Sequence, residues 1–266
     1  MKYPRPDKKQ AEEELTMEKI SSRKNAYISH VRLLSSDTGY RREQGQYLCD
    51  GIKTLKEAVR FGAEIVSVLW KGQEQSLPGL DGCRQYVASE ELFDYASPMK
   101  NSPGPLFVVK AKPASSAAEL KRAIVLENLQ DPGNVGTVIR TANALGIDAV
   151  ILVGNCADLF NPKTVRASMG AIFRQRVIQT DMEGLSRILR QNDLKLYGAA
   201  LTDRARDIGT VDIQRAAVAI GSEGQGLSPE FLTICDGQLI IPMEPDSESF
   251  NAAVAAAIVM WEMRVR

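Results

Sequence analysis

The sequence predicts an α/β protein, in which a smaller N-terminal α/β domain precedes a C-terminal domain built on a parallel sheet. Apolar strands alternate with helical segments through the second half of the chain, which is the pattern of a parallel sheet covered by helices. A Pro/Ser/Ala-rich stretch, "KPASSAAELKR" at 112–122, marks the boundary between the two halves. The length of 266 residues and the hydrophobic content of 44% fit two modest globular domains.

The N-terminal half begins with residues 1–20, a charged segment without helical or strand periodicity that is expected to be mobile. Residues 21–112 form the first predicted domain, in which helical spacing of apolar residues gives way to short apolar runs. The predicted elements are a helix at 25–36, a strand, a helix and a strand within 47–72, a strand at 83–89, a short helix at 90–97 and a strand at 106–112.

The C-terminal domain is expected to span residues 118–266. Its predicted strands are Ala123–Leu126, Ala149–Val153, Leu196–Leu201, Ala217–Ile220 and Gln238–Ile241, with helical segments between them. The last helix is expected to cover Asn251–Arg264. In parallel sheets of this kind, ligands bind at the carboxyl ends of the strands.

Three polar, glycine- or proline-containing segments each follow one of these strands. They are "ENLQDPGNVG" (127–136), "GSEGQGLSPE" (221–230) and "PMEPDSESFN" (242–251). Because they leave the same edge of one sheet, together they predict a pocket. The glycine spacing does not fit a dinucleotide fingerprint and no P-loop is present, which disfavours a nucleotide-dependent oxidoreductase. Each glycine taken alone is also explained as a turn or a helix cap.

Arg140 is a fixed positive charge on the helix that follows the first of these segments. The apolar residues of this helix place Arg140 on the opposite face, near Gly136. A guanidinium at the ligand-binding edge can clamp a phosphate through two hydrogen bonds, and a glycine lets another group approach closely. The alternative is an ordinary solvated arginine.

The most apolar run of the chain is "FNAAVAAAIVMW" (250–261), which is too short to span a bilayer at roughly 20 residues per span. As a helix it is apolar or small on nearly every side, and such a helix is buried all round. We therefore expect one face to pack on its own sheet and another on a second subunit. The alternative is a helix tucked beneath a long loop.

Composition limits the possible partners. The formal net charge is zero, so a nucleic acid would have to bind to local basic patches. The four cysteines lie far apart and there is a single histidine, so no zinc pattern is present. Reduced thiols and an N-terminus without the apolar core of a secretory signal favour a cytoplasmic protein.

Three segments resemble, in order and spacing, the motifs of the SpoU (TrmH) family of RNA ribose 2′-O-methyltransferases in the SPOUT superfamily. They are "NVGTVIRTANALG", "AIGSEGQGL" and "IPMEPDSESFNAAVAAA". The segment at 161–177 is similar to the one that follows the first motif, so the resemblance covers about residues 120–264. The N-terminal half, chiefly through "YLCDGIKTLKEAV", is similar in outline to the RNA substrate-binding domain often fused to this catalytic domain.

The resemblance implies a SPOUT domain with a deep trefoil knot, an exception to the rule against threaded loops. S-adenosylmethionine would bind in the knot, and the enzyme would be a homodimer joined through its C-terminal helix. Neither a metal nor a membrane is expected. The residues expected to contact S-adenosylmethionine are Leu201, Thr202, Gly221, Ile241 and Phe250, the last of which replaces a more frequent leucine.

The resemblance also implies catalytic roles for Arg140, Asn134, Glu223, Ser249 and Asn251. In the proposal made for the family, a substrate phosphate helps Arg140 to take up the proton of the 2′-hydroxyl. An unaided guanidinium keeps its proton near neutral pH and therefore cannot accept another. The larger expected contribution of Arg140 is to position the phosphate and the hydroxyl. Ser249 has a second explanation as the N-cap of the last helix.

The RNA backbone is expected to contact Arg41, Arg42, Lys163, Arg166 and Arg174, although each of them alone could be a plain solvated charge. His30 lies outside the motifs and is expected to be structural or exposed. The leading hypothesis is S-adenosylmethionine-dependent methylation of a ribose 2′-hydroxyl in large-subunit rRNA. The alternatives are a tRNA 2′-O-methyltransferase and a non-catalytic RNA-binding ribosome-assembly factor on the same fold.

Overall fold

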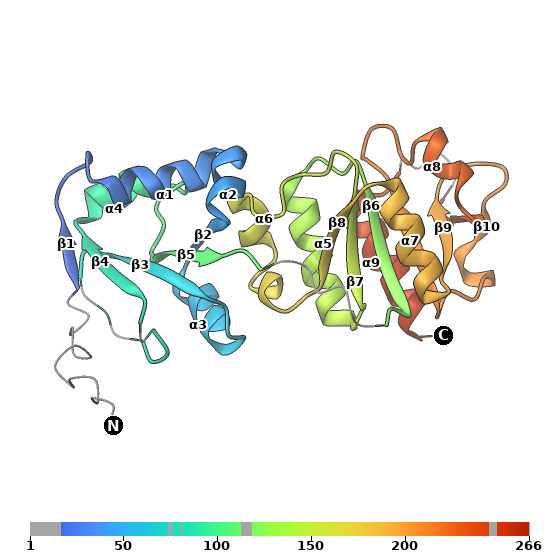
Figure 1. The fold of residues 1–266 in the computed structure, drawn as a ribbon. Helices are drawn as coiled ribbons and strands as arrows, with labels where there is room; N and C mark the ends of the chain where they lie inside the picture. The colour runs from blue at the N-terminus through green and yellow to red at the C-terminus, as the bar shows by residue number, and fades with distance from the viewer. Residues whose placement is uncertain are drawn as a thin grey trace, which may run out of the picture. The chain divides into compact units, whose positions relative to one another are not determined.

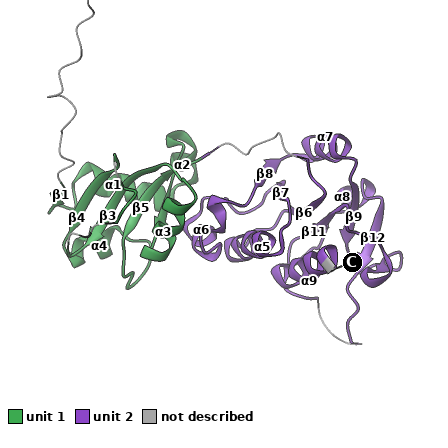
Figure 2. Ribbon diagram, turned by 90° about the horizontal axis from the view of Figure 1, so that it is seen from below, with its two compact units in different colours: residues 1–111 green, residues 112–266 purple. Residues whose placement is uncertain are grey.

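The computed structural model describes residues 17–73, 75, 77–80, 82–112, 119–244 and 249–265 (Figure 1). The chain divides into two compact units, residues 1–111 and residues 112–266 (Figure 2). In the described part of the chain, no helix combines the length and the apolar character needed to cross a bilayer.

The first unit is built on a mixed five-stranded sheet in the order β1-β4-β3-β5-β2. β1, β4 and β3 run parallel, and β5 pairs antiparallel with β3 and β2. The strands are β1 (Glu18–Ile20), β2 (Gln46–Asp50), β3 (Ile65–Lys71), β4 (Arg84–Ala88) and β5 (Leu106–Lys110). The helices are α1 (Ala26–Ser36), α2 (Thr38–Gln44), α3 (Ile52–Arg60) and α4 (Glu90–Ala96). Apolar residues of α1 and α4 pack on the sheet to form the core of this unit.

Two elements of the first unit differ from the sequence prediction. Residues 18–20, expected to belong to a mobile tail, form β1 and pair in register with β4, where Ile20 is buried. Pairing with β4 makes residues 18–20 a strand, although their own sequence pattern does not predict one. Residues 1–16, the rest of the predicted tail, lie outside the described residues. α2 was not predicted, although the Asp37 carboxylate caps its start by accepting the Tyr40 N–H at 2.9 Å.

The second unit is built on a parallel seven-stranded sheet in the order β10-β12-β9-β11-β6-β7-β8. The strands are β6 (Arg122–Glu127), β7 (Ala149–Val153), β8 (Val177–Thr180), β9 (Lys195–Ala199), β10 (Arg206–Asp207), β11 (Ala216–Ile220) and β12 (Gly237–Ile240). The predicted α/β class and parallel sheet are confirmed. The five predicted strands are present within two residues at each end, whereas β8 and β10 were missed because they are short and lie at the sheet edges.

Helices cover both faces of this sheet, as Figure 2 shows, with α5 and α9 on one face and α7 and α8 on the other, while α6 packs against α5. Their bounds are α5 (Pro132–Leu145), α6 (Pro162–Ala167), α7 (Met182–Asn192), α8 (Pro229–Thr233) and α9 (Ala252–Val265). Because successive strand residues point to opposite faces, Ile124 and Leu126 enter one core cluster while Ala123 and Val125 enter the other. The sheet is therefore buried on both sides.

Helix α5 shows why glycine stands at position 136. The helix starts at Pro132, is capped by the Asp131 carboxylate, and ends at Gly146 in the left-handed conformation with φ of 69°. A Cβ on Gly136 would lie only 2.4 Å from the backbone oxygen of Thr164 in α6. The close approach predicted for this glycine is therefore made by a neighbouring helix of the same unit.

Helix α9 has two apolar faces with different surroundings. Ala256, Val259 and Met260 are fully buried against the rest of the second unit. On the other side, Val254 is 47% exposed and Trp261 is 52% exposed. These two exposed residues are seven positions apart, so they lie on the same face of the helix.

Candidate active site

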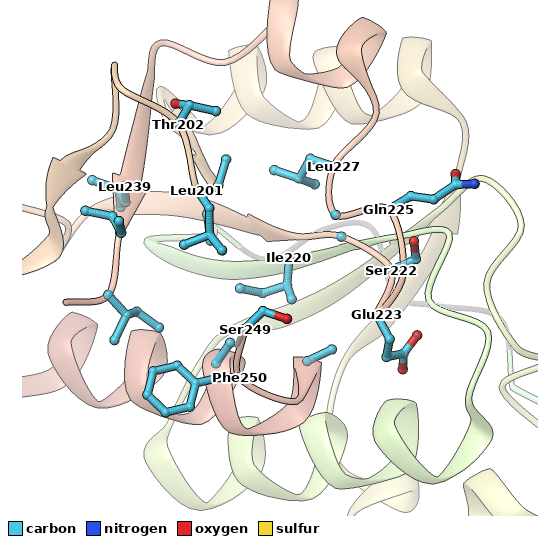
Figure 3. Close-up of a pocket in the computed structure, with 18 of the residues that line it drawn as sticks. Leu201, Thr202, Ile220, Ser222, Glu223, Gln225, Leu227, Leu239, Ser249 and Phe250 are labelled. Atoms are coloured by element: carbon cyan, nitrogen blue, oxygen red, sulfur yellow. The ribbon is translucent and has the colours of Figure 1, made fainter. Parts of the chain in front are cut away.

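A cavity of about 390 Å³ lies at the carboxyl ends of β9, β11 and β12 (Figure 3). It is lined by residues that follow these strands and by the residues that lead into α9. Two of the three loops predicted to converge, those after β11 and β12, contribute to its wall. The loop after β6 reaches the site through hydrogen bonds with residues of the other two loops. The cavity has the size of ordinary small-molecule sites.

The residues predicted from the resemblance to contact S-adenosylmethionine all line this cavity: Leu201, Thr202, Gly221, Ile241 and Phe250. Leu201 is 61% exposed and Phe250 is 41% exposed. Figure 3 shows Phe250 at the start of α9, Leu201 on the segment after β9 and Ile220 at the end of β11. The wall therefore offers apolar surface from three separate segments.

The loop after β11 needs glycine because its backbone folds back on itself. Ser222 and Gly226 form an antiparallel bridge, with N–H to carbonyl distances of 3.1 and 2.9 Å. A Cβ on Gly221 would lie 2.0 Å from the carbonyl carbon of Gly226, so no other residue fits there without moving the loop. Gly221, Ser222 and Gly226 all line the cavity.

Asn134, Glu223 and Asn251 are brought together by hydrogen bonds. The Asn251 side-chain amide donates to Asn134 Oδ1 at 3.2 Å, and Asn134 Nδ2 donates to Glu223 Oε1 at 2.5 Å. Glu223 also lines the cavity, and its side chain points from the loop towards α5 (Figure 3). This network joins the loops after β6, β11 and β12, which are far apart in the sequence.

Ser249 lines the cavity, but it is not the residue that caps α9. Asn251 Oδ1 accepts the N–H groups of Ala253 at 2.9 Å and Val254 at 3.3 Å. Asn251, directly before the helix, is therefore the N-cap, and the alternative explanation of Ser249 was wrong. One amide side chain both caps α9 and holds Asn134.

Arg140 is exposed on α5 and is not among the cavity-lining residues. No hydrogen bond or ion pair joins its guanidinium to another residue in the described part of the chain. It lies six positions after Asn134 on the same helix, which corresponds to about 9 Å along the axis. The structure thus leaves the guanidinium available to an external group, and its catalytic role stays a prediction.

The residues predicted to bind RNA fall into two groups. Arg42, Lys163, Arg166 and Arg174 are exposed, and Arg174 Nε donates to Asn143 Oδ1 at 2.9 Å. Arg41 is only 4% exposed, because its guanidinium donates to Leu34 O and Thr38 Oγ1, each at 2.8 Å. The prediction that Arg41 contacts phosphate is therefore corrected, since this arginine ties α1 to α2 within the first unit.

His30 is a half-buried structural residue, as expected. Nδ1 lies 2.9 Å from the Tyr40 hydroxyl, and Nε2 lies 3.1 Å from Gln46 Oε1. Because Gln46 Oε1 can only accept, Nε2 carries the proton and Nδ1 accepts from Tyr40. Burial lowers the pKa of His30, which keeps it neutral.

No cysteine is among the described residues that line the cavity. All four cysteines are free. Cys235 has its pKa raised to about 12, chiefly by burial, so its thiol stays protonated. Among the described residues, no group of three or more His, Cys, Asp or Glu side chains could hold a metal ion.

Sequence reasoning missed one charged residue beside the cavity. Glu127 is 5% exposed at the end of β6 and hydrogen-bonds to Ser228, which follows the cavity-lining loop. The available signal was a carboxylate ending the otherwise apolar strand "RAIVLE". Such a group is rarely buried without a specific partner.

Comparison with known proteins shows the family to which this chain belongs. The SpoU rRNA Methylase family matches residues 121–261. The 23S rRNA (guanosine(2553)-2′-O)-methyltransferase RlmP of Bacillus subtilis is 30% identical, with 93% of this chain and 100% of that protein covered. The 23S rRNA (uridine(2479)-2′-O)-methyltransferase of Streptomyces viridochromogenes is 27% identical, with 92% and 91% covered.

A solved structure shares the fold across both units. The SpoU methyltransferase AviRb of Streptomyces viridochromogenes, in complex with the cofactor AdoMet, superposes with a TM-score of 0.80 and 25% identity, covering 90% of this chain and 97% of that one. The residues that match the SpoU rRNA Methylase family include the whole cavity wall after β9, β11 and β12. The chain therefore belongs to the SpoU rRNA methylase family.

Proposed function

We propose that this protein transfers a methyl group from S-adenosylmethionine to a ribose 2′-hydroxyl of RNA, and that its substrate is large-subunit rRNA. The observation that carries the proposal is the cavity beside the Asn134–Glu223–Asn251 network, at the carboxyl end of a parallel sheet. Family membership and the two curated 23S rRNA enzymes support the reaction and the class of RNA.

The cavity fits S-adenosylmethionine in size and in chemistry. Leu201, Ile220 and Phe250 offer apolar surface for a purine ring, and the turn at Gly221 lets backbone groups come close to a ligand. When bound, S-adenosylmethionine supplies the methyl group on its sulfonium. The contribution of the protein is to hold the donor in one pose and to exclude others.

The neighbouring polar residues would orient the ribose. Asn134 and Glu223 present hydrogen-bonding groups at the rim of the cavity, and Ser249 adds a hydroxyl to its wall. Arg140 would clamp a substrate phosphate and thereby fix the 2′-hydroxyl against the methyl donor. Arg42, Lys163, Arg166 and Arg174 are the exposed residues that would bind the RNA backbone.

The proposal includes a homodimer joined through α9. The exposed face of this helix carries Val254 and Trp261, which are large apolar residues next to a fully buried opposite face. Exposed apolar surface of this kind is typical of protein–protein contacts. The trefoil knot, the RNA-binding role of the first unit and a cytoplasmic location belong to the same proposal.

The test measures donor binding and methyl transfer separately. Calorimetric titration with S-adenosylmethionine is expected to show binding, and tritiated methyl groups should enter rRNA that lacks the natural modification. Arg140→Ala is expected to abolish transfer while the donor still binds, because Arg140 lies outside the cavity wall. Loss of donor binding in this variant would contradict the role given to Arg140, and absence of donor binding in the unaltered protein would contradict the proposed function.

A further inference from the structure

Glu127 is a buried carboxylate for which the proposed reaction has no direct use. It ends β6 and is 5% exposed. Its Oε2 accepts the backbone N–H of Ser228 at 2.8 Å, and its Oε1 accepts the Ser228 hydroxyl at 2.5 Å. Asn128 Nδ2 donates a longer bond of 3.4 Å to the same carboxylate. Both oxygens are thus engaged by one residue that lies 101 positions away.

No lysine or arginine forms an ion pair with Glu127 in the described part of the chain. Burial of a carboxylate without a cation is costly, and it persists only where hydrogen bonds compensate it. Here the compensation comes from a single serine, through its backbone and its side chain together. The arrangement is therefore a specific clamp between Glu127 and Ser228.

Ser228 occupies the position where the cavity-lining loop ends and α8 begins. Its hydroxyl accepts the N–H of Phe231 at 3.1 Å and so caps α8. The residue before it, Leu227, is 6% exposed and belongs to the cavity wall. Because Leu227 and Ser228 are joined by a peptide bond, a displacement of Ser228 also displaces Leu227 in the cavity wall.

The loop 221–228 leaves the sheet at the end of β11, and its last residue is hydrogen-bonded to the end of the neighbouring strand β6. β11 and β6 are paired, with Ile220 opposite Leu126, so Gly221 leaves the sheet beside Glu127. The loop closes on itself at the Ser222–Gly226 bridge and is then held by the clamp at Ser228. The hydrogen bonds of Glu127 thus hold the C-terminal end of the loop, at Ser228, to the sheet. Its N-terminal end, at Gly221, is held because it continues directly from β11.

We propose that Glu127 is a positioning residue for the methyl-donor pocket. Through Ser228, Glu127 holds the loop 221–228 in its binding conformation before the donor binds. The inference rests on the proposed function, since it assigns the donor to this cavity. Preorganisation of a loop increases affinity because the ordering does not have to occur on binding. Loss of the clamp therefore weakens donor binding without touching the RNA-binding residues.

The test compares Glu127→Ala, Glu127→Gln and Ser228→Ala in the full chain. Glu127→Ala removes both acceptors, and the dissociation constant for S-adenosylmethionine, measured by calorimetry below the melting temperature, is expected to rise about tenfold or more. Glu127→Gln is expected to restore most of the affinity, because an amide can accept the Ser228 N–H and donate to its hydroxyl. Ser228→Ala keeps the backbone half of the clamp and is expected to lie between them.

A matched control separates positioning from simple loss of stability. Ile151→Val makes a small cavity in β7, in the same core cluster as Leu227, and is expected to lower the melting temperature with an unchanged donor dissociation constant. RNA affinity, measured by filter binding, should be the same in all the variants. If Glu127→Ala does not fold, Ser228→Ala and Glu127→Gln still provide the comparison.

Two outcomes are distinguishable. Folded Glu127→Ala and Ser228→Ala proteins that bind S-adenosylmethionine as tightly as the unaltered protein would overturn the clamp but leave the proposed function standing. An unaltered protein that does not bind S-adenosylmethionine would overturn the proposed function itself.

Discussion

The side chains of Asn134 and Glu223, which are 89 positions apart, share a 2.5 Å hydrogen bond at the rim of the cavity. Asn134 lies in the first turn of α5, and Glu223 lies in the loop after β11. The bond therefore connects the helix that carries Arg140 with a loop that lines the cavity. Single substitutions at either residue can therefore test whether α5 and the loop after β11 have to be held together.

Asn134→Asp is expected to reduce turnover by about a hundredfold while the protein remains folded. The new carboxylate would face Glu223 and repel it, yet an acidic residue in the first turn of a helix is itself favourable for the helix. Single-turnover methyl transfer and the melting temperature measure the two effects separately. Thr141→Ala, on the same helix, is the control, and comparable rates in the two variants would refute the importance of this contact.

Gly221→Ala is expected to abolish donor binding, because its methyl group would lie 2.0 Å from the backbone of Gly226 and force the loop to open. The strain of such overpacking costs about 1–3 kcal/mol of stability. Thr233→Ala is the control, since Thr233 is exposed on α8 and lies outside the cavity wall. Calorimetry with S-adenosylmethionine on both variants decides the matter, and equal affinities would contradict the proposed donor site.

Trp261→Glu is expected to convert a dimer into folded monomers, because it places a charge on the exposed apolar face of α9. A substitution at Ala256 would not test this, since Ala256 is fully buried within its own unit and a charge there would unfold it. Arg264→Glu serves as a control on the same helix. Light scattering coupled to size-exclusion chromatography gives the mass of each species, and an unchanged dimer in Trp261→Glu would exclude this interface.

The stability of the first unit is expected to decrease as the pH falls below about 6.5. Burial lowers the pKa of His30 below its ordinary value of 6.5, so the unfolded chain binds a proton more readily than the folded one. The stabilisation is complete above pH 6.5 and is lost as the pH falls through the pKa of the folded state. Urea unfolding followed by the buried Trp70, in a Trp261→Phe background, measures this. His30→Gln should remove this part of the pH dependence, and an identical profile would show that another group causes it.

The local pattern of the chain determined most of the second unit. Runs such as Ala149–Val153 are apolar throughout, and a strand buried on both faces needs no other signal. Caps and glycines set the ends of α5, since Asp131 and Gly146 act on their own neighbours in the sequence. Short edge strands such as β1 escaped prediction because their order comes from a partner strand, β4, far along the chain.

The sequence by itself determined that three polar loops follow parallel strands and that their residues match the family motifs. Only the tertiary structure decided that Arg41 is buried, that Asn251 rather than Ser249 caps α9, and that Glu127 holds Ser228. The physical reason is distance along the chain. Periodicity and capping act over a few residues, whereas burial and the partner of a polar side chain depend on segments that meet only when the sheet has formed.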